Sequence, residues 1–275
     1  MDTVVEYSVD GHVARLTLNS PHNRNALSTA LVDQLQRGLR DAAADPRVRV
    51  IVLGHTGGTF CAGADLSEAG GGSARGERGA AGQGGSPPSP SDAAAARARE
   101  MAALMRAIVA SPLPVIGAID GHVRAGGFGL VGACDIVVAG PRSTFALTEA
   151  RIGVAPAIIS LTLLPKLSAR AAARYYLTGE TFDAARAAEI GLVSLAADDV
   201  DAAVAKLVAD VGKGSPQGLA ASKALTTAGV LAGFDRDAAR LAAESARLFV
   251  SDEAREGMLA FLQKRPPSWA NSPDV

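Results

Sequence analysis

Glycine is distributed unevenly along this 275-residue chain, and its placement constrains the possible fold more than any other feature. Of the 30 glycines, 18 lie between Gly54 and Gly132, in three groups at 54–63, 70–85 and 117–132. Ordering a glycine is entropically costly, and its structural use is at backbone positions that other residues cannot adopt. Each group therefore indicates either a close approach of the backbone or a loop without a fixed conformation.

The overall composition narrows the class of protein. A hydrophobic fraction of 48% with 20% charged residues is typical of a globular chain with a substantial core. A formal net charge of −1 and only 4% aromatic residues argue against a nucleic-acid binder. No apolar run reaches about 18 residues and the start has no signal-peptide pattern, so we expect a cytoplasmic protein without a membrane span. Two cysteines and four scattered histidines argue against a disulfide scaffold and against a metal site.

Hydrophobic periodicity predicts an α/β core followed by a helical tail. Strand-forming residues flank Asp10-Gly11 and predict a hairpin, and Ser28 is placed to cap a helix. We assign residues 1–198 to the core and residues 199–275 to a C-terminal helical region. The predicted strands are 4–9, 13–18, 48–53, 115–119, 136–139, 144–147 and 193–195, and the predicted core helices are 28–43, 92–109 and 126–133. Between them, residues 68–91 have almost no large apolar side chain and are predicted to form a mobile loop.

The first and third glycine groups each follow a predicted strand. The first ends in Thr59–Leu66 (TFCAGADL), whose small side chains let a ligand approach the backbone. The third, Ile119–Leu130, opens a short helix, and a helix N-terminus presents unpaired N–H groups to an anionic oxygen. Two such donors could hold one carbonyl oxygen as an oxyanion hole, and each segment is also consistent with an ordinary tight turn.

A dinucleotide-binding loop is a rival interpretation of the third group. Gly127–Gly132 has the form G-x-G-x-x-G, and Glu149 lies 20 residues beyond Gly129. That motif normally follows its strand almost directly, whereas the predicted strand here ends about seven residues earlier, near Ile119. A nicotinamide-binding protein is therefore the weaker hypothesis. The chain has no GxSxG, P-loop or HExxH motif that would indicate an esterase, a nucleoside triphosphatase or a zinc protease.

Glu149 follows the predicted strand 144–147 and is surrounded by small residues. Burial at such a place would raise the pKa of its carboxyl group and suit it to general acid–base chemistry. The alternative is an exposed glutamate at a helix start. Cys61 has no recognisable histidine partner, so we expect a buried structural thiol. His122 could line a pocket, but we expect a surface or hydrogen-bonded structural role.

The chain carries, in order, the segments Asn23–Ser28 (NRNALS), Phe60–Leu66 (FCAGADL), Gly121–Leu130 followed by Cys134-Asp135-Ile136, Phe145–Pro156, and Phe261–Arg265 (FLQKR). Together they resemble the enoyl-CoA hydratase/isomerase (crotonase) family over nearly the whole chain. The resemblance implies an α/β fold, a spiral of repeated ββα units with a C-terminal α-helical trimerisation region. It also implies a homotrimer or a homohexamer made of two trimers. The implied substrate is an acyl-coenzyme A thioester, with no permanently bound cofactor.

The resemblance also assigns roles to individual residues. By position, the backbone N–H groups of Ala64 and Gly126 would hold the thioester oxygen and stabilise the enolate formed at the α-carbon. Glu149 matches a family glutamate that acts as an acid–base group. Lys264 matches a C-terminal lysine that reaches a coenzyme phosphate, often across a subunit interface. The residues implied to bind the coenzyme are Arg24, Ala26, Leu27, Ala62, Asp65, Leu66 and Lys264.

The chain departs from the family pattern at Gly129, where typical hydratases carry a second glutamate. One carboxylate can in principle serve hydration of a 2-enoyl-CoA, so a hydratase is the leading hypothesis. Moving a double bond from the 3 to the 2 position needs one base, so a Δ3-Δ2 isomerase using Glu149 alone is the runner-up, followed by a catalytically weak acyl-CoA-binding protein. Glu68 or Glu77 could supply a substitute acid. We expect the loop 68–91 to be either a lid on the acyl pocket or a surface insertion without a role.

Overall fold

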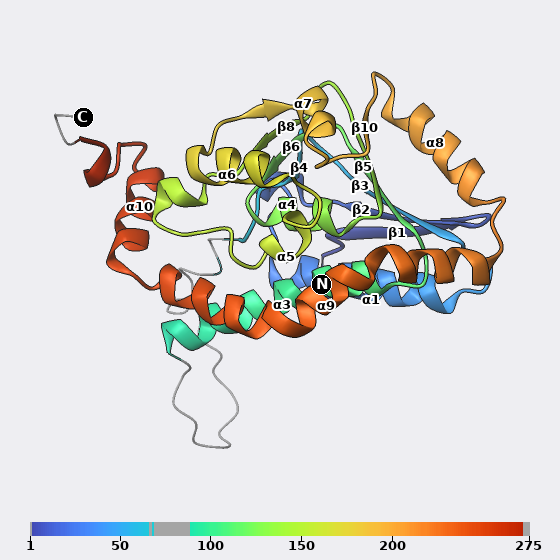
Figure 1. Cartoon of the computed structure of the whole chain (residues 1–275), viewed down its shortest axis with the longest axis horizontal. Helices are drawn as coiled ribbons and strands as arrows, with labels where there is room; N and C mark the ends of the chain where they lie inside the picture. The colour runs from blue at the N-terminus through green and yellow to red at the C-terminus, as the bar shows by residue number, and fades with distance from the viewer. Residues whose placement is uncertain (1, 66–67, 69–88, 272–275) are drawn as a thin grey trace, which may run out of the picture.

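The computed structural model describes residues 2–65, 68 and 89–271. Two sheets lie in the middle of the molecule and helices surround them (Figure 1). Within these residues the larger sheet has the strand order β1 (Val5–Asp10), β2 (Val13–Leu18), β3 (Val50–His55), β5 (Val115–Ile119), β7 (Ile136–Ala139) and β10 (Leu195–Ala196). The smaller sheet has the order β4 (Thr59–Cys61), β6 (His122–Arg124), β8 (Thr144–Ala146) and β9 (Phe182–Asp183).

Helices make up most of the remaining described chain. The α-helices are α1 (Thr29–Ala44), α3 (Pro90–Ala110), α4 (Gly126–Ala133), α5 (Ser160–Leu163), α6 (Ala169–Thr178), α7 (Ala184–Glu189), α8 (Val200–Val211), α9 (Pro216–Phe249) and α10 (Asp252–Leu262). The 3-10 helices are η1 (Pro21–Asn23), η2 (Glu149–Ile152) and η3 (Ser268–Asn271). Among the described residues, no helix combines the length and apolarity needed to cross a bilayer.

From β3 to β8, consecutive strands alternate between the two sheets. β3, β5 and β7 pair in parallel in the larger sheet, and the strand that follows each of them, β4, β6 or β8, pairs in parallel in the smaller one. This alternation gives the repeated ββα spiral that was predicted, and the β1–β2 hairpin is confirmed as antiparallel. The prediction was incomplete because β4 and β6 were expected as turns. It also placed the last strand early, since the Val193 N–H donates to Ala187 O and pairing starts at Leu195.

The central strands of the larger sheet, β3, β5 and β7, are buried on both faces. Ile51 and Leu53 point into the main core, whereas Val50 and Val52 face a second apolar cluster that includes Val200 of α8. Burial on both faces explains why these strands are continuous apolar runs without alternation. Figure 1 shows α8 on one side of this sheet and α9 lying along α3 on the other.

A buried ion pair fastens α9 to the core. The side chain of Lys223 is 5% exposed, and its Nζ lies 2.7 Å from Asp135 Oδ2. It also donates to the carbonyl oxygens of Ile108 and Leu113, each at 2.9 Å. Burial lowers the pKa of Lys223, and the negative charge of Asp135 opposes that shift. Asp135 in turn accepts the Val115 N–H at 2.7 Å, so this cation ties the tail to the start of β5.

Candidate active site

The loop between β2 and α1 is shaped by a buried asparagine. Asn25 is completely buried and has a positive φ of 51°, a conformation that asparagine tolerates better than most residues. Its Oδ1 accepts the Ser20 N–H at 2.7 Å, and its Nδ2 donates to Thr56 O at 3.0 Å and Thr59 O at 2.8 Å. These bonds hold the loop against β4, an edge strand of the smaller sheet.

This loop gathers most of the residues predicted to bind the coenzyme. Ala62 N donates to Arg24 O at 3.1 Å, and Leu27 N donates to Gly63 O at 2.7 Å. Asn23 Nδ2 donates to Asp65 Oδ2 at 3.3 Å, so the two segments meet along their length. The predicted residues brought together here are Arg24, Ala26, Leu27, Ala62 and Asp65.

Two predicted coenzyme contacts are not part of this group. Leu66 lies outside the described residues. Lys264 is exposed after α10 with a φ of 54°, and among the described residues no hydrogen bond or ion pair joins it to the loop of Arg24. Its predicted role across a subunit interface therefore stays a prediction.

The segment after β4 packs directly against the start of α4. Gly63 has a φ of 94°, and a Cβ built on it would lie only 3.1 Å from the backbone nitrogen of Gly126. Gly126 is the first residue of α4, where N–H groups have no acceptor within the helix. Among the described residues, neither the Ala64 N–H nor the Gly126 N–H donates a hydrogen bond. The two predicted oxyanion donors are therefore neighbours, and both are available.

Glu149 is a buried carboxyl group that follows β8, and β8 pairs in parallel with β6, the strand that leads to Gly126. It begins η2, is 8% exposed, and its Oε2 has no hydrogen-bond partner among the described residues. Burial raises the pKa of Glu149 to about 7, although a hydrogen bond from its own backbone N–H opposes the shift. The predicted burial and direction of the pKa shift are both confirmed. A carboxyl group with a pKa near neutrality can both take and return a proton.

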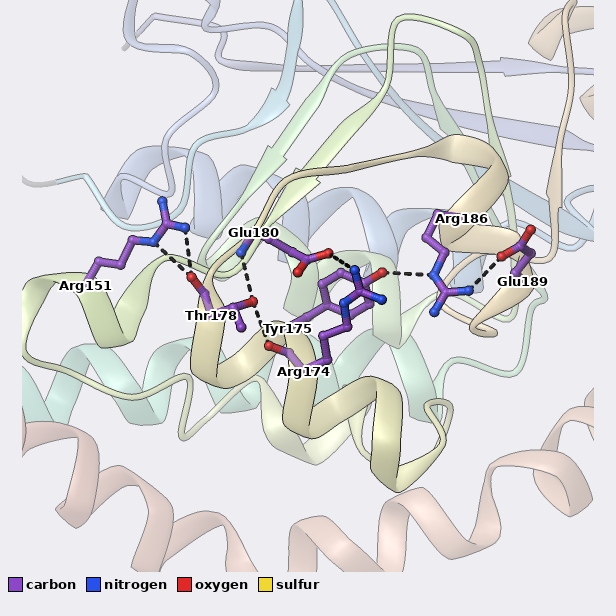
Figure 2. A network of polar contacts seen from close by, with 7 residues as sticks. All are labelled: Arg151, Arg174, Tyr175, Thr178, Glu180, Arg186 and Glu189. Atoms are coloured by element: carbon purple, nitrogen blue, oxygen red, sulfur yellow. Dashed lines mark hydrogen bonds and ion pairs between the residues drawn. The ribbon is translucent and has the colours of Figure 1, made fainter. Parts of the chain in front are cut away.

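Flanking helices fix the position of η2. The guanidinium of Arg151 donates from Nε and Nη2 to Thr178 O, at 3.1 and 2.8 Å, at the C-terminus of α6 (Figure 2). On the other side, a Cβ on Gly153 would lie 2.6 Å from the backbone of Glu253 in α10. Glu149 is thus carried by a short turn held between two helices.

Apolar side chains surround the position of the missing glutamate. A Cβ on Gly129 would lie 2.5 Å from Met105 Sδ, 2.8 Å from Ile159 Cγ2 and 2.9 Å from Met101 Cε. The glycine lets α3 and α5 approach α4 closely. The G-x-G-x-x-G segment lies inside α4, where its glycines permit helix packing, so the dinucleotide-loop hypothesis is wrong.

The other candidates have structural environments. Cys61 is fully buried, burial raises its pKa to about 12, and its Sγ accepts the Gly63 N–H, as expected of a structural thiol. His122 is exposed and lies 2.8 Å from Thr144 Oγ1. The Glu68 carboxylate accepts from Thr29 at the start of α1 and pairs with Arg97 at 2.7 Å, so it is engaged elsewhere. Glu77 and residues 69–88 of the predicted lid lie outside the described residues.

Sequence reasoning missed one polar pair, which joins α5 to α6, the helix that packs against η2. Ser160 Oγ, at the start of α5, lies 3.2 Å from the Tyr176 hydroxyl in α6. Burial raises the pKa of Tyr176 to about 12, and the negative charge of Glu149 adds to the shift. Both residues lie in a stretch whose only sequence signal was helical periodicity.

Comparison with known proteins agrees with this geometry. Residues 8–272 match the family model for enoyl-CoA hydratase/isomerase. The chain belongs to the enoyl-CoA hydratase/isomerase family. This member is 32% identical over 273 residues to the mevalonyl-coenzyme A hydratase of Aspergillus fumigatus, covering 95% of this chain and 92% of that one. It is 31% identical over 260 residues to the 2,3-dehydroadipyl-CoA hydratase of Escherichia coli, covering 94% of each. A crystal structure of an enoyl-CoA hydratase from Mycobacterium avium has 73% identity and a TM-score of 0.87, covering 98% of this chain and 100% of that one.

Proposed function

We propose that this family member hydrates a 2-enoyl-CoA with Glu149 as its acid–base group. The observation that carries the proposal is a buried carboxyl group with a pKa of about 7, whose Oε2 has no partner among the described residues. It follows β8, the parallel neighbour of the strand β6 that leads to Gly126, and a Cβ on Gly126 would lie 3.8 Å from the backbone nitrogen of Ala64. The N–H groups of Ala64 and Gly126 bind the thioester oxygen. Negative charge on that oxygen grows as the enolate forms, so these donors act mainly on the transition state.

One carboxylate is sufficient for the proton balance of hydration. The water oxygen bonds to C3, the C2–C3 double bond gives its electron pair to the thioester enolate, and Glu149 takes the proton from water. Glu149 then returns a proton to C2, which regenerates the thioester and the carboxylate. The coenzyme takes part only as the carrier of the substrate, on the side of Arg24, Ala26, Leu27, Ala62 and Asp65, with Leu66 and Lys264 completing that set.

A Δ3-Δ2 enoyl-CoA isomerase is the second candidate, and the apolar wall at Gly129 favours it. In that reaction Glu149 removes a proton from C2 of a 3-enoyl-CoA and returns it to C4 of the dienolate, with no water consumed. The same oxyanion hole serves both reactions, so the fate of the enolate decides between them.

The quaternary structure belongs to the same proposal. Phe261 and Leu262 at the end of α10 are 65% and 69% exposed, and Leu225 of α9 is 82% exposed. Exposed apolar side chains of this size mark a surface that another subunit can cover, which supports the proposed homotrimer, or homohexamer of two trimers. Light scattering of the purified protein tests it, and a monomer contradicts it. We also propose a cytoplasmic location.

The test is Glu149→Gln assayed with a panel of short, long and branched 2- and 3-enoyl-CoAs. Loss of a positioned acid–base group should lower the rate by about 10²–10⁴-fold. Glu68→Gln is the matched control and should keep the wild-type rate. Unchanged rates for Glu149→Gln in both assays would contradict the proposal. A wild-type protein that binds the thioesters without turnover or α-proton exchange in deuterated water would be the weak-binding family member instead.

A further inference from the structure

Two hydroxyl groups lie on the elements that flank Glu149. Ser160 follows Ile159, the residue whose Cγ2 would lie 2.8 Å from a Cβ on Gly129. Tyr176 lies in α6, two residues before Thr178, whose carbonyl oxygen binds the guanidinium of Arg151. Their hydroxyl oxygens are 3.2 Å apart. The pair thus connects the helix beside the glutamate-free position with the helix fastened to η2.

The hydrogen bonds of this pair leave the phenol oxygen of Tyr176 able to accept a further hydrogen bond. Ser160 Oγ lies 2.7 Å from Pro156 O, so its only proton is donated there. The Tyr176 O–H must therefore donate to Ser160 Oγ. Burial keeps the phenol neutral, because it raises the pKa of Tyr176 to about 12. The phenol oxygen consequently has no proton to give, but it keeps lone pairs that can accept one.

Water in a dry site needs two acceptors. One hydrogen of the reacting water is transferred to Glu149. The other can no longer donate to bulk water, and leaving it without an acceptor costs free energy. The side chains that surround Gly129, those of Met101, Met105 and Ile159, supply no strong hydrogen-bond acceptor. Thr162 Oγ1 also lies at this wall, but it is fully buried and directs its proton to the carbonyl oxygens of Gly129 and Ile159. The Ser160–Tyr176 pair is a second polar group, carried in part by α6, which packs against η2, and the negative charge of Glu149 acts on Tyr176.

We propose that the phenol oxygen of Tyr176 accepts the second hydrogen of the reacting water, and that Ser160 positions it by taking the phenol proton. The proposal rests on the hydration reaction proposed above. It assigns a neutral acceptor to the task for which typical relatives are expected to use a second carboxylate. It also separates the two candidate reactions, because isomerisation consumes no water and should not depend on Tyr176.

Tyr176→Phe tests the proposal directly. Hydration kcat/KM should fall about tenfold, the value of one lost hydrogen bond, with the KM for the thioester and the rate of 3-enoyl-CoA isomerisation unchanged. Tyr175→Phe is the matched control on the same helix. The Tyr175 hydroxyl accepts instead from Arg186 Nε at 2.9 Å (Figure 2), so this variant should retain wild-type hydration. Ser160→Ala should lower hydration less, and the double variant should match Tyr176→Phe.

Three results would overturn the proposal. Hydration by Tyr176→Phe within twofold of wild type would refute it, as would an equal fall in hydration and isomerisation, which indicates a structural role. A wild-type protein that isomerises but does not hydrate would refute it as well. Glu149→Gln, measured beside these variants, distinguishes the cases. If that variant is inactive while Tyr176→Phe is normal, only the present inference fails; if it retains full activity, the proposed function fails too.

Discussion

A methyl group on Gly63 would lie 2.6 Å from the Cβ of Ala125, a separation that real Cβ atoms do not adopt. The φ of Gly63, 94°, also disfavours any side chain. Gly63→Ala should therefore displace Gly126 and disrupt the pair of N–H donors. We expect kcat to fall about 10²–10³-fold, the loss typical of one missing oxyanion donor. Gly58→Ala is the control, because nothing lies within 4 Å of a Cβ there. A Gly63→Ala variant with the kcat of this control would contradict the assignment.

Ala125 adopts a backbone conformation that suits glycine. Its φ of 45° and ψ of −122° lie in a region that costs a non-glycine residue about 1–3 kcal/mol. Ala125→Gly removes this strain but adds flexibility to the unfolded chain, which costs about 0.5–1 kcal/mol. We predict that the free energy of unfolding stays equal or rises by up to about 2 kcal/mol and that activity is retained, as measured by denaturant titration and enoyl-CoA assays. A clear loss of stability would show that the Ala125 methyl group is needed for packing.

The ionisation of Glu149 should set the pH dependence of the rate. Hydration and isomerisation both begin with the carboxylate, and burial raises its pKa to about 7. We therefore expect kcat/KM to rise with pH up to an apparent pKa near 7 and then to level off. The measurement is kcat/KM as a function of pH, from rates at substrate concentrations below and above KM at each pH value. An acid limb centred near pH 4.5, the ordinary value for a glutamate carboxyl group, would contradict the raised pKa of Glu149.

The same burial should make stability fall as pH rises. The folded state holds the Glu149 proton more tightly than the unfolded state, so stability is lost between about pH 4.5 and 7. Glu149→Gln removes this titration. Its free energy of unfolding relative to wild type should therefore increase by about 2–3 kcal/mol from pH 5 to pH 8. Denaturant titrations at both pH values check this, and a constant difference would contradict the buried, unpaired carboxyl group.

Restoring the family glutamate should fail. In Gly129→Glu the new carboxyl group would enter the space of Met101, Met105 and Ile159, which offers no strong hydrogen-bond donor. We predict a loss of about 2–4 kcal/mol of stability from overpacking and burial of a polar group, without faster hydration. Adding Met105→Ala makes room and should recover part of the stability. A stable single variant that hydrates faster than wild type would show that the wall is adaptable.

Long apolar patterns could be predicted from the sequence, and short pairings could not. The bounds of β5, β7 and α4 are those predicted, because these segments are apolar throughout and bounded by turn or polar residues. β4 and β6 have three residues each, too few for a strand pattern to stand out from the neighbouring glycine-rich turns. They are strands only because the spiral brings them beside each other, which is a long-range effect that local propensity does not contain.

The same distinction applies to the candidate site. The proximity of the segments holding Ala64 and Gly126, and the burial of Glu149, followed from ordered motifs and are found in the structure. Ser160 and Tyr176 gave no such signal, because serine and tyrosine within helical periodicity are common in many roles. Their relation to Glu149 arises from the packing of α6 against η2, and only the fold places them together.

The buried cation of Lys223 makes the C-terminal helices part of the folding unit. A chain cut after residue 198 would keep Asp135 and the carbonyl groups of Ile108 and Leu113 but lose the ammonium group that all three contact. Loss of one partner of a buried ion pair typically costs about 3–5 kcal/mol, a large share of the net stability of a domain. The boundary at 198 therefore separates two regions of the chain that differ in architecture but do not unfold independently. Residues 1–198 and the helices that follow should unfold in one transition.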